Sequence, residues 1–325
     1  MSTSLEPPRA TPPGPRGKPL LGNVLEFKKD TVGAIVRGWR EYGDVVKFRG
    51  PGQFFPLHLF AHPDHIQYVF QDNFRNYRRQ DFLRKKFQMV VGNGLVTSEG
   101  DSWVRQRKLA QTAFQRERLN ALGPAMTATT DETLQRWRQL AAERTPIDIQ
   151  SEMMHLILAI LTRTLFGVDL SGDAAEVEHS VATQAKYLND RLNSPIDIPE
   201  RAPIPVQRRF LAARATLDRL VEGVIAERRR SGEDTGDLLS ILLQATDEET
   251  GEPISDEQAR DEIKTLLIAG HETTATTLGW TFYLLSKHPD VAEGIRAELS
   301  EVLGDRAPTA EDVPNLKYLT MVLYE

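Results

Sequence analysis

Residues 255–287 read SDEQARDEIKTLLIAGHETTATTLGWTFYLLSK, and His288-Pro289 follows them. Ser255 with Gln258 forms a capping box, which predicts where a helix begins. Pro289 predicts where it ends, because proline lacks an amide hydrogen and restrains the residue before it. A helix between these signals would have about 32 residues and span roughly 48 Å, enough to cross a whole domain. Its middle, residues 266–270, is apolar on every side, which predicts burial.

The residues after this apolar middle break the usual helix rules. Glu272 is followed by four threonines within residues 273–277, although threonine is a poor helix former whose hydroxyl takes carbonyls from the helix ladder. Such local inconsistency is typical of functional sites. The plainer interpretation, in which the threonines bond the backbone and Glu272 points to water, stays open. A zinc protease site is excluded, because its His-Glu-x-x-His pattern needs a histidine where the chain has Ala275.

The rest of the chain predicts a mainly helical protein with a small β-sheet near the N-terminus, an α+β class. Proline-rich residues 1–22 indicate an extended arm, and residues 23–325 a single domain. Strands are expected at 45–48, 55–60 and 147–149. Helices are expected at 31–42, 101–115, 117–143, 150–166, 174–192, 204–230, 236–245, 255–287 and 290–303.

Composition excludes several classes of protein. The chain has 325 residues, of which 26% are charged, and its net charge of -6 argues against a general nucleic-acid binder. It has no cysteine, which rules out disulfides, cysteine zinc sites and iron–sulfur clusters held by these residues. No stretch approaches the ~20 apolar residues of a membrane span, and the N-terminus lacks the apolar core of a signal peptide. We therefore expect a soluble, cytoplasmic protein without a membrane anchor.

Residues 269–274, Ala-Gly-His-Glu-Thr-Thr, resemble the oxygen-pocket motif of the cytochrome P-450 family. The resemblance implies that Ala269 and Gly270 lie against the haem and leave room for dioxygen. It also implies that Thr273 positions the oxygen being activated while Glu272 helps to relay protons, a task that suits an acid–alcohol pair. We expect this pair to be buried on a bent helix.

Further residues match the same family in the same order along the chain. Trp103 and Arg107 match its Trp-x-x-x-Arg motif, which implies that they bind one haem propionate; arginine suits a carboxylate through its forked donors. Alone, that spacing is better explained by a core tryptophan beside a surface arginine. Leu95 and Val96 match the start of the substrate loop, which implies contact with haem or substrate. Glu325 matches the glutamate of the family's Glu-x-x-Arg motif.

The resemblance implies the cofactor haem b, and no cysteine of this chain can ligate its iron. We therefore expect a domain that is incomplete at its C-terminus, before the haem-ligating cysteine. His271 stands beside the oxygen motif, and we expect it to face core or solvent rather than iron.

The function expected from the resemblance is a soluble bacterial haem monooxygenase, inserting one oxygen atom from dioxygen into a small apolar organic substrate. Electrons would come from a ferredoxin- or flavodoxin-type partner. Basic residues form two clusters that would suit an acidic partner, although ordinary solvated helix faces explain them equally well. The clusters are Arg75, Arg78, Arg79, Arg84, Lys85 and Lys86, and then Arg105, Arg107, Lys108, Arg116 and Arg118.

The same residues allow two alternative functions, of which the first stays open and the second is disfavoured. One is a non-enzymatic remnant, or a helical fragment that binds apolar ligands without haem, which the missing cysteine supports. The other is a peroxygenase use of the same fold. The acid–alcohol pair of Glu272 and Thr273 disfavours that use.

Overall fold

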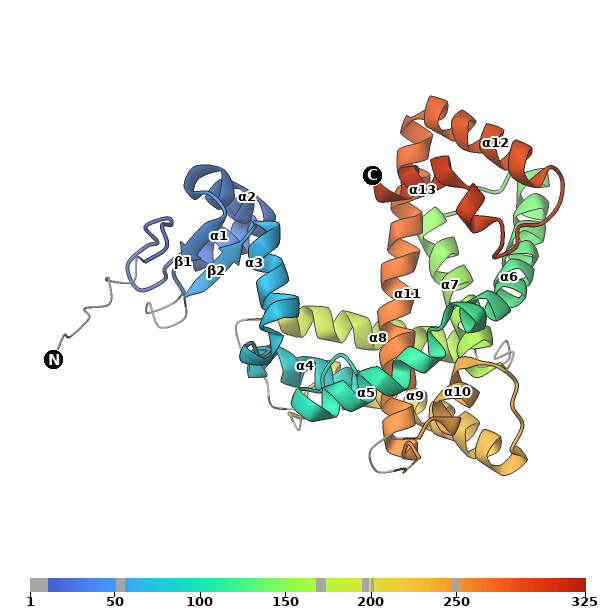
Figure 1. The fold of residues 1–325 in the computed structure, drawn as a ribbon, viewed down its shortest axis with the longest axis horizontal. Helices are drawn as coiled ribbons and strands as arrows, with labels where there is room; N and C mark the ends of the chain where they lie inside the picture. Colours follow the sequence, from blue (N-terminus) through green and yellow to red (C-terminus); the bar gives the residue numbers. More distant parts are fainter. Residues whose placement is uncertain are drawn as a thin grey trace. The chain divides into compact units, whose positions relative to one another are not determined.

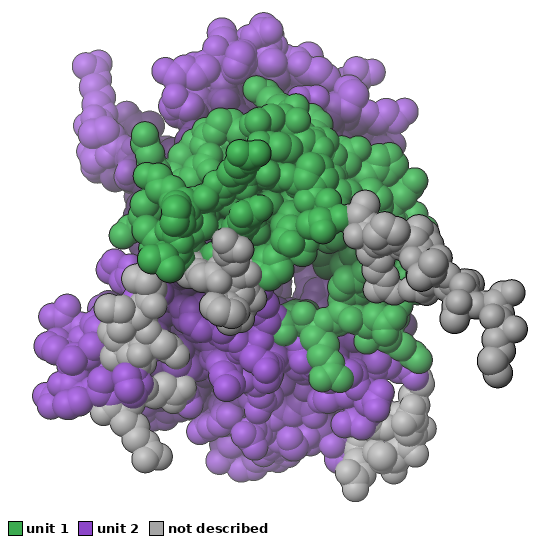
Figure 2. Space-filling view, turned by 90° about the vertical axis from the view of Figure 1, so that its left-hand side faces the viewer, with its two compact units in different colours: residues 1–79 green, residues 80–325 purple. Residues whose placement is uncertain are grey.

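The computed structural model describes residues 11–50, 56–167, 174–194, 199, 202–246, 251 and 253–325. The chain forms two compact units, residues 1–79 and residues 80–325, which Figure 2 shows in different colours. The sequence-based division into an arm and one domain at residue 22 stays a prediction.

Unit 1 holds the small sheet. Strands β1 (Val45–Phe48) and β2 (Leu57–Phe60) pair antiparallel. The backbone of the proline-rich arm lies on β1, where Lys47 N donates to Pro13 O at 2.8 Å. The helical segments of this unit are α1 (Val24–Lys29), α2 (Thr31–Tyr42), α3 (Pro63–Gln67), a π-helical turn (Tyr68–Asp72) and a 3-10 turn (Phe74–Asn76). The strand 45–48 and the helix 31–42 confirm their predictions. The second predicted strand begins at Leu57, and residue 55 lies outside the described part.

Unit 2 is built from helices. They are α4 (Asp81–Val91), α5 (Gly100–Ala113), α6 (Arg116–Ala142), α7 (Ile149–Phe166), α8 (Ala174–Asn193), α9 (Pro205–Ser231), α10 (Leu238–Gln244), α11 (Asp256–Lys287), α12 (Pro289–Leu303), a 3-10 turn (Val313–Asn315) and α13 (Lys317–Tyr324). Every helix predicted between residues 101 and 303 is present, with ends within two residues of the prediction. The mainly helical class is therefore confirmed.

The strand predicted at 147–149 is wrong. Asp148 is instead the N-cap of α7, and its Oδ1 accepts a hydrogen bond from Ser151 N at 2.7 Å. The β-branched residues Ile147 and Ile149 favour a strand locally, but the aspartate satisfies a free amide in the first helical turn. The helix that follows decides the conformation.

Helix α11 organises unit 2. It is a single helix of 32 residues that runs through the unit and lies alongside α7 (Figure 1). Ser255 Oγ accepts from Gln258 N at 3.2 Å, which confirms the predicted start. The helix ends before Pro289, as predicted.

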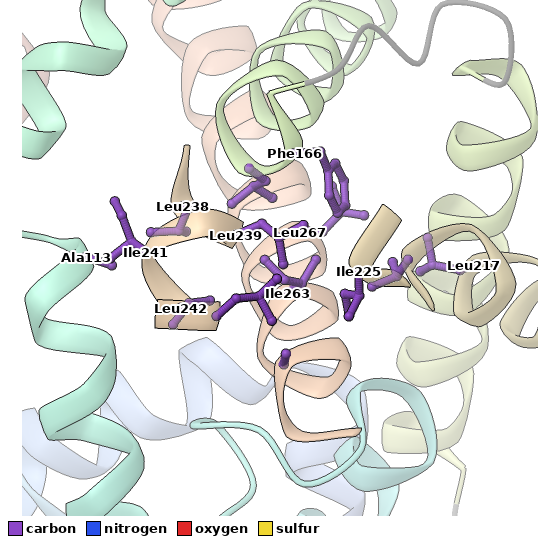
Figure 3. Close-up of a cluster of buried hydrophobic side chains, with 14 of the residues drawn as sticks. Ala113, Phe166, Leu217, Ile225, Leu238, Leu239, Ile241, Leu242, Ile263 and Leu267 are labelled. Carbon is purple, nitrogen blue, oxygen red and sulfur yellow. The ribbon is translucent and has the colours of Figure 1, made fainter. Parts of the chain in front are cut away.

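The largest core cluster gathers around the first half of α11. Ile263 and Leu267 of α11 are completely buried and meet Leu239 and Leu242 of α10 (Figure 3). Helices α7 and α9 add further apolar side chains to it, among them Phe166, Leu217, Val221 and Ile225. This core fixes the N-terminal half of α11 firmly in the unit.

Candidate functional site

The residues of the oxygen motif are divided between two faces of α11. Leu267, His271, Ala275 and Gly279 follow one another at four-residue steps and are all buried. His271 Nε2 donates to Met154 O of α7 at 3.0 Å, and Ala275 packs against Met153, Leu156 and Ile157. This face therefore packs on α7.

His271 belongs to this packed face. Burial lowers the pKa of His271, and the acceptor Met154 O partly opposes that effect. The histidine is therefore neutral and held in the core at neutral pH. The expectation that His271 faces core or solvent is confirmed.

Gly270 also faces α7. A Cβ on Gly270 would lie 3.3 Å from Leu161 Cδ2 of α7, so a side chain there would crowd the helix contact. Its role toward a cofactor, implied by the resemblance, stays a prediction. The geometry indicates a role in bringing two helices close together.

The opposite face of α11 carries Ala269 and Thr273, four residues apart, with Trp280 two turns farther on. All three residues are exposed, and Glu272 beside them is exposed too. The predicted burial of Glu272 and Thr273, and of the apolar middle on every side, is wrong. Apolar residues predict that some neighbour covers a helix, but only the face toward α7 and the core is covered within the described residues.

The threonine hydroxyls bond to the helix itself. Thr273 Oγ1 donates to Ala269 O at 2.6 Å, Thr277 Oγ1 to Thr273 O at 2.9 Å and Thr281 Oγ1 to Thr277 O at 2.8 Å. Each therefore bonds a carbonyl one turn earlier. This is the plainer interpretation of the motif threonines, and it holds for Thr273 and Thr277; Thr281 bonds in the same way one turn farther on.

Leu95 and Val96 belong to a loop, residues 92–97, that lies on the first half of α11. Asn93 N donates to Asp261 Oδ2 at 2.7 Å, and Leu95 N donates to Glu262 Oε2 at 3.0 Å. The loop is closed by Thr97 Oγ1, which donates to Gly92 O at 2.6 Å. The backbone amides of Asn93 and Leu95 thus attach this loop to carboxyl groups of α11.

Glu262 is an unusual carboxyl. It is 3% exposed, and burial raises its pKa to about 7; the charge of Asp261 adds to this, while the Leu95 amide opposes it. Asp261 is also buried but pairs with Arg260, whose Nη2 lies 2.9 Å from Asp261 Oδ1. Sequence analysis missed both acids. They stand in the charged first part of α11, residues 256–264 (DEQARDEIK), where no local pattern separates a buried acid from a solvent-exposed one.

Trp103 and Arg107 share one face of α5, as their four-residue spacing requires. Trp103 is half-buried and Arg107 is exposed. Gln106 Nε2 donates to Asn93 O at 2.9 Å, so α5 is tied to the loop that carries Leu95. Loop, α5 and α11 therefore form one connected region of unit 2.

The basic residues fall into different environments. Lys86 is buried, and its ammonium group donates to Arg191 O and lies 3.7 Å from the Phe82 ring centroid. Its expected place on a docking surface is therefore wrong. The aliphatic stem and ring contact hold it inside unit 2. Arg105, Lys108, Arg116 and Arg118 are exposed on α5 and α6.

Three remaining expectations concern metal ions, membranes and Glu325. Among the described residues, no group of three or more His, Asp or Glu side chains is arranged to hold a metal ion. Within those same ranges, no helix has the length and apolarity needed to cross a membrane. Glu325 is exposed and follows α13, and its matching to the Glu-x-x-Arg motif stays a prediction.

Comparison with known proteins identifies the fold family. The family model for cytochrome P-450 matches residues 12–325. The chain belongs to the cytochrome P-450 family. It is 34% identical to cyclooctatin synthase of Streptomyces melanosporofaciens over 96% of this chain and 66% of that protein. It is 35% identical to cyclooctat-9-en-7-ol 5-monooxygenase of the same organism, over 98% of this chain and 68% of that protein. It is 32% identical to pentalenene oxygenase of Streptomyces avermitilis, over 96% of this chain and 67% of that protein.

The cytochrome P-450 chain thus spans about two thirds of the length of these relatives. Cytochromes P-450 carry haem b, and the residues present fit part of such a site. An exposed helix face with a small side chain, Ala269, leaves room for a flat group, and Arg107 offers forked donors for a carboxylate. No cysteine among the 325 residues can serve as the axial thiolate. The residues present therefore offer part of what a haem site needs, and a thiolate ligand is not among them.

Proposed function

We propose that this protein is a haem-dependent monooxygenase that inserts one oxygen atom from dioxygen into a small apolar organic substrate. Membership of the cytochrome P-450 family supports the proposal, as do relatives named as oxygenases. The observation that carries it is the acid–alcohol pair, Glu272 and Thr273, beside Ala269 on the exposed face of α11. When bound, haem supplies the iron at which dioxygen is reduced and cleaved.

The residues of this chain would hold the cofactor and deliver protons. Arg107 and the Trp103 ring nitrogen would bind a propionate, while Leu95 and Val96 would contact haem or substrate. Thr273 would position an oxygen ligand, and Glu272 would pass protons toward it from water. The exposed position of Glu272 gives it direct access to solvent protons.

Haem titration tests whether the site binds its cofactor. We expect the 325-residue chain to bind haem b, followed by absorbance, and Arg107→Ala to weaken binding about tenfold or more through loss of a charged hydrogen-bond donor. Arg138→Ala removes an exposed arginine of α6 and serves as the matched control. If the unchanged chain binds no haem, the alternative of a haem-free binder of apolar ligands is preferred.

Turnover tests the role of Thr273. The chain can be joined to the C-terminal third of cyclooctat-9-en-7-ol 5-monooxygenase and supplied with cyclooctat-9-en-7-ol and pentalenene, because relatives are named for these compounds. Thr273→Ala should lower product formed per electron pair while peroxide or water rises, and Thr274→Ala is the control. Unchanged coupling in Thr273→Ala would contradict the assignment.

We further propose that the redox partner is an acidic ferredoxin or flavodoxin that docks on α5 and α6. The exposed basic side chains there support this, since opposite charges accelerate association. In the same chimera, neutralising Lys108 and Arg116 should slow reduction and flatten its dependence on salt. An unchanged rate and salt dependence would refute the docking site.

A further inference from the structure

The loop 92–97 packs directly against backbone and side-chain atoms of α11. A Cβ on Gly94 would lie 2.3 Å from Thr265 Oγ1 and 2.8 Å from Asp261 O. A Cβ on Gly92 would lie 2.2 Å from Asp261 Oδ2. Since real Cβ atoms do not approach so closely, only glycine permits this contact. The close approach of the loop to α11 therefore depends on glycine at positions 92 and 94.

Two neighbouring carboxyl groups supply the hydrogen bonds at this contact. Asp261 accepts from the amide of Asn93 and Glu262 from the amide of Leu95. The loop itself has no titratable side chain, and α5 contributes the amide of Gln106. On α11 the nearby cations are already paired, Arg260 with Asp261 and Glu222, and Lys264 with Asp218.

Stability alone does not explain Glu262. Its second oxygen, Oε1, is buried and has no hydrogen-bond partner among the described residues. A buried polar atom without a partner destabilises the folded state, and an apolar residue would avoid that penalty. A residue that breaks this rule is expected where function requires it.

Glu262 lies on the same face of α11 as Ala269 and Thr273. Residues 262, 269 and 273 are separated by seven and four positions, which places them along one side of an α-helix. Ala269 is about 10 Å farther along the axis than Glu262 at ~1.5 Å per residue. The amide that Glu262 holds belongs to Leu95, which is half-buried, and the next residue, Val96, is 39% exposed.

We propose that Asp261 and Glu262 are positioning residues, which hold loop 92–97 on α11 so that Leu95 and Val96 border the space in front of Ala269 and Thr273. The two carboxyls act through the backbone amides of Asn93 and Leu95, so they touch neither cofactor nor substrate. This inference rests on the proposed function, because haem and substrate would occupy that space.

Hydrogen exchange on the 325-residue chain tests the hydrogen bonds. Glu262→Leu removes the acceptor at similar size, and the Leu95 amide should exchange about tenfold faster because its protecting bond is lost. Glu262→Gln keeps an acceptor oxygen and should restore slow exchange. Glu301→Leu, at an exposed acid of α12, is the matched control. If Glu262→Leu does not fold, Gly94→Ala replaces it as the disruptive variant. Its added methyl group pushes the loop away from α11 and should likewise make the Leu95 amide exchange faster.

Haem affinity of the same variants tests the positioning role. Glu262→Leu and Gly94→Ala should weaken haem binding severalfold, and Glu262→Gln should keep the original affinity. Unchanged exchange at Leu95 in both disruptive variants would overturn the hydrogen-bonded attachment. Faster exchange with unchanged haem affinity would overturn the positioning role. Failure of the unchanged chain to bind haem would instead refute the proposed function, and exchange at Leu95 would still decide the attachment.

Discussion

Replacing Glu262 by glutamine should remove a pH dependence of stability that the buried carboxyl imposes. In the unfolded chain this carboxyl ionises near its ordinary pKa of 4.5, whereas burial in the folded chain raises the pKa to about 7. The folded state therefore keeps its proton to higher pH. The free energy of unfolding must fall as pH rises from about 4.5 to about 7, and the loss persists at higher pH. The full shift corresponds to about 3 kcal/mol.

The assay is urea unfolding of the unchanged chain and of Glu262→Gln at several pH values from 4.5 to 8. Glutamine keeps an acceptor for the Leu95 amide and never ionises, so the stability of the variant relative to the unchanged chain should rise by up to about 3 kcal/mol across this range. Carboxyls distant from residue 262 are the same in both proteins, so their contributions cancel in this difference. Glu301→Gln, at an exposed acid on α12, is the matched control. A constant difference for Glu262→Gln would refute the reasoning.

Three further predictions concern stability and the cofactor. Arg228→Ala should lower the free energy of unfolding in urea by about 3–5 kcal/mol, because it leaves the Asp237 carboxylate buried without the guanidinium whose Nη2 lies 2.8 Å from its Oδ2. A loss below ~1 kcal/mol would contradict the importance of this pair. Asp148→Ala should lower stability by about 1 kcal/mol through loss of the α7 cap, and Asp148→Ser should keep most of it. The haem-loaded 325-residue chain should show no thiolate-type ferrous–CO absorption, since it has no cysteine; that absorption would disprove the statement.

Helices were predictable wherever short-range signals mark their ends. Ser255 caps α11, Pro289 stops it, and Gly43 follows α2. These signals act within one turn, so a sequence pattern contains them. The strand predicted at 147–149 failed because the cap Asp148 competes with β-branched neighbours, and only the packing of α7 decides between them.

The site could be predicted only in part. The motif identified the residues of α11 that carry the resemblance, but a periodic pattern does not say which element covers each face. It therefore could not decide between the expected burial of Glu272 and Thr273 and the plainer interpretation, in which Glu272 points to water. The partners of Asp261 and Glu262 lie more than 160 positions earlier in the chain. Likewise, the buried ion pair of Arg228 with Asp237 joins the end of α9 to the cap of α10, and no local pattern predicts it.

The bond from Thr273 Oγ1 to Ala269 O limits what this hydroxyl can offer to a neighbour. A hydroxyl has one hydrogen and two lone pairs, and here the hydrogen already points along the helix. Toward a molecule in front of α11, Thr273 in this rotamer is a pure acceptor, so it favours a ligand that itself carries a hydrogen. Donating instead requires rotation of the hydroxyl about the Cβ–Oγ1 bond and the loss of one hydrogen bond within the helix.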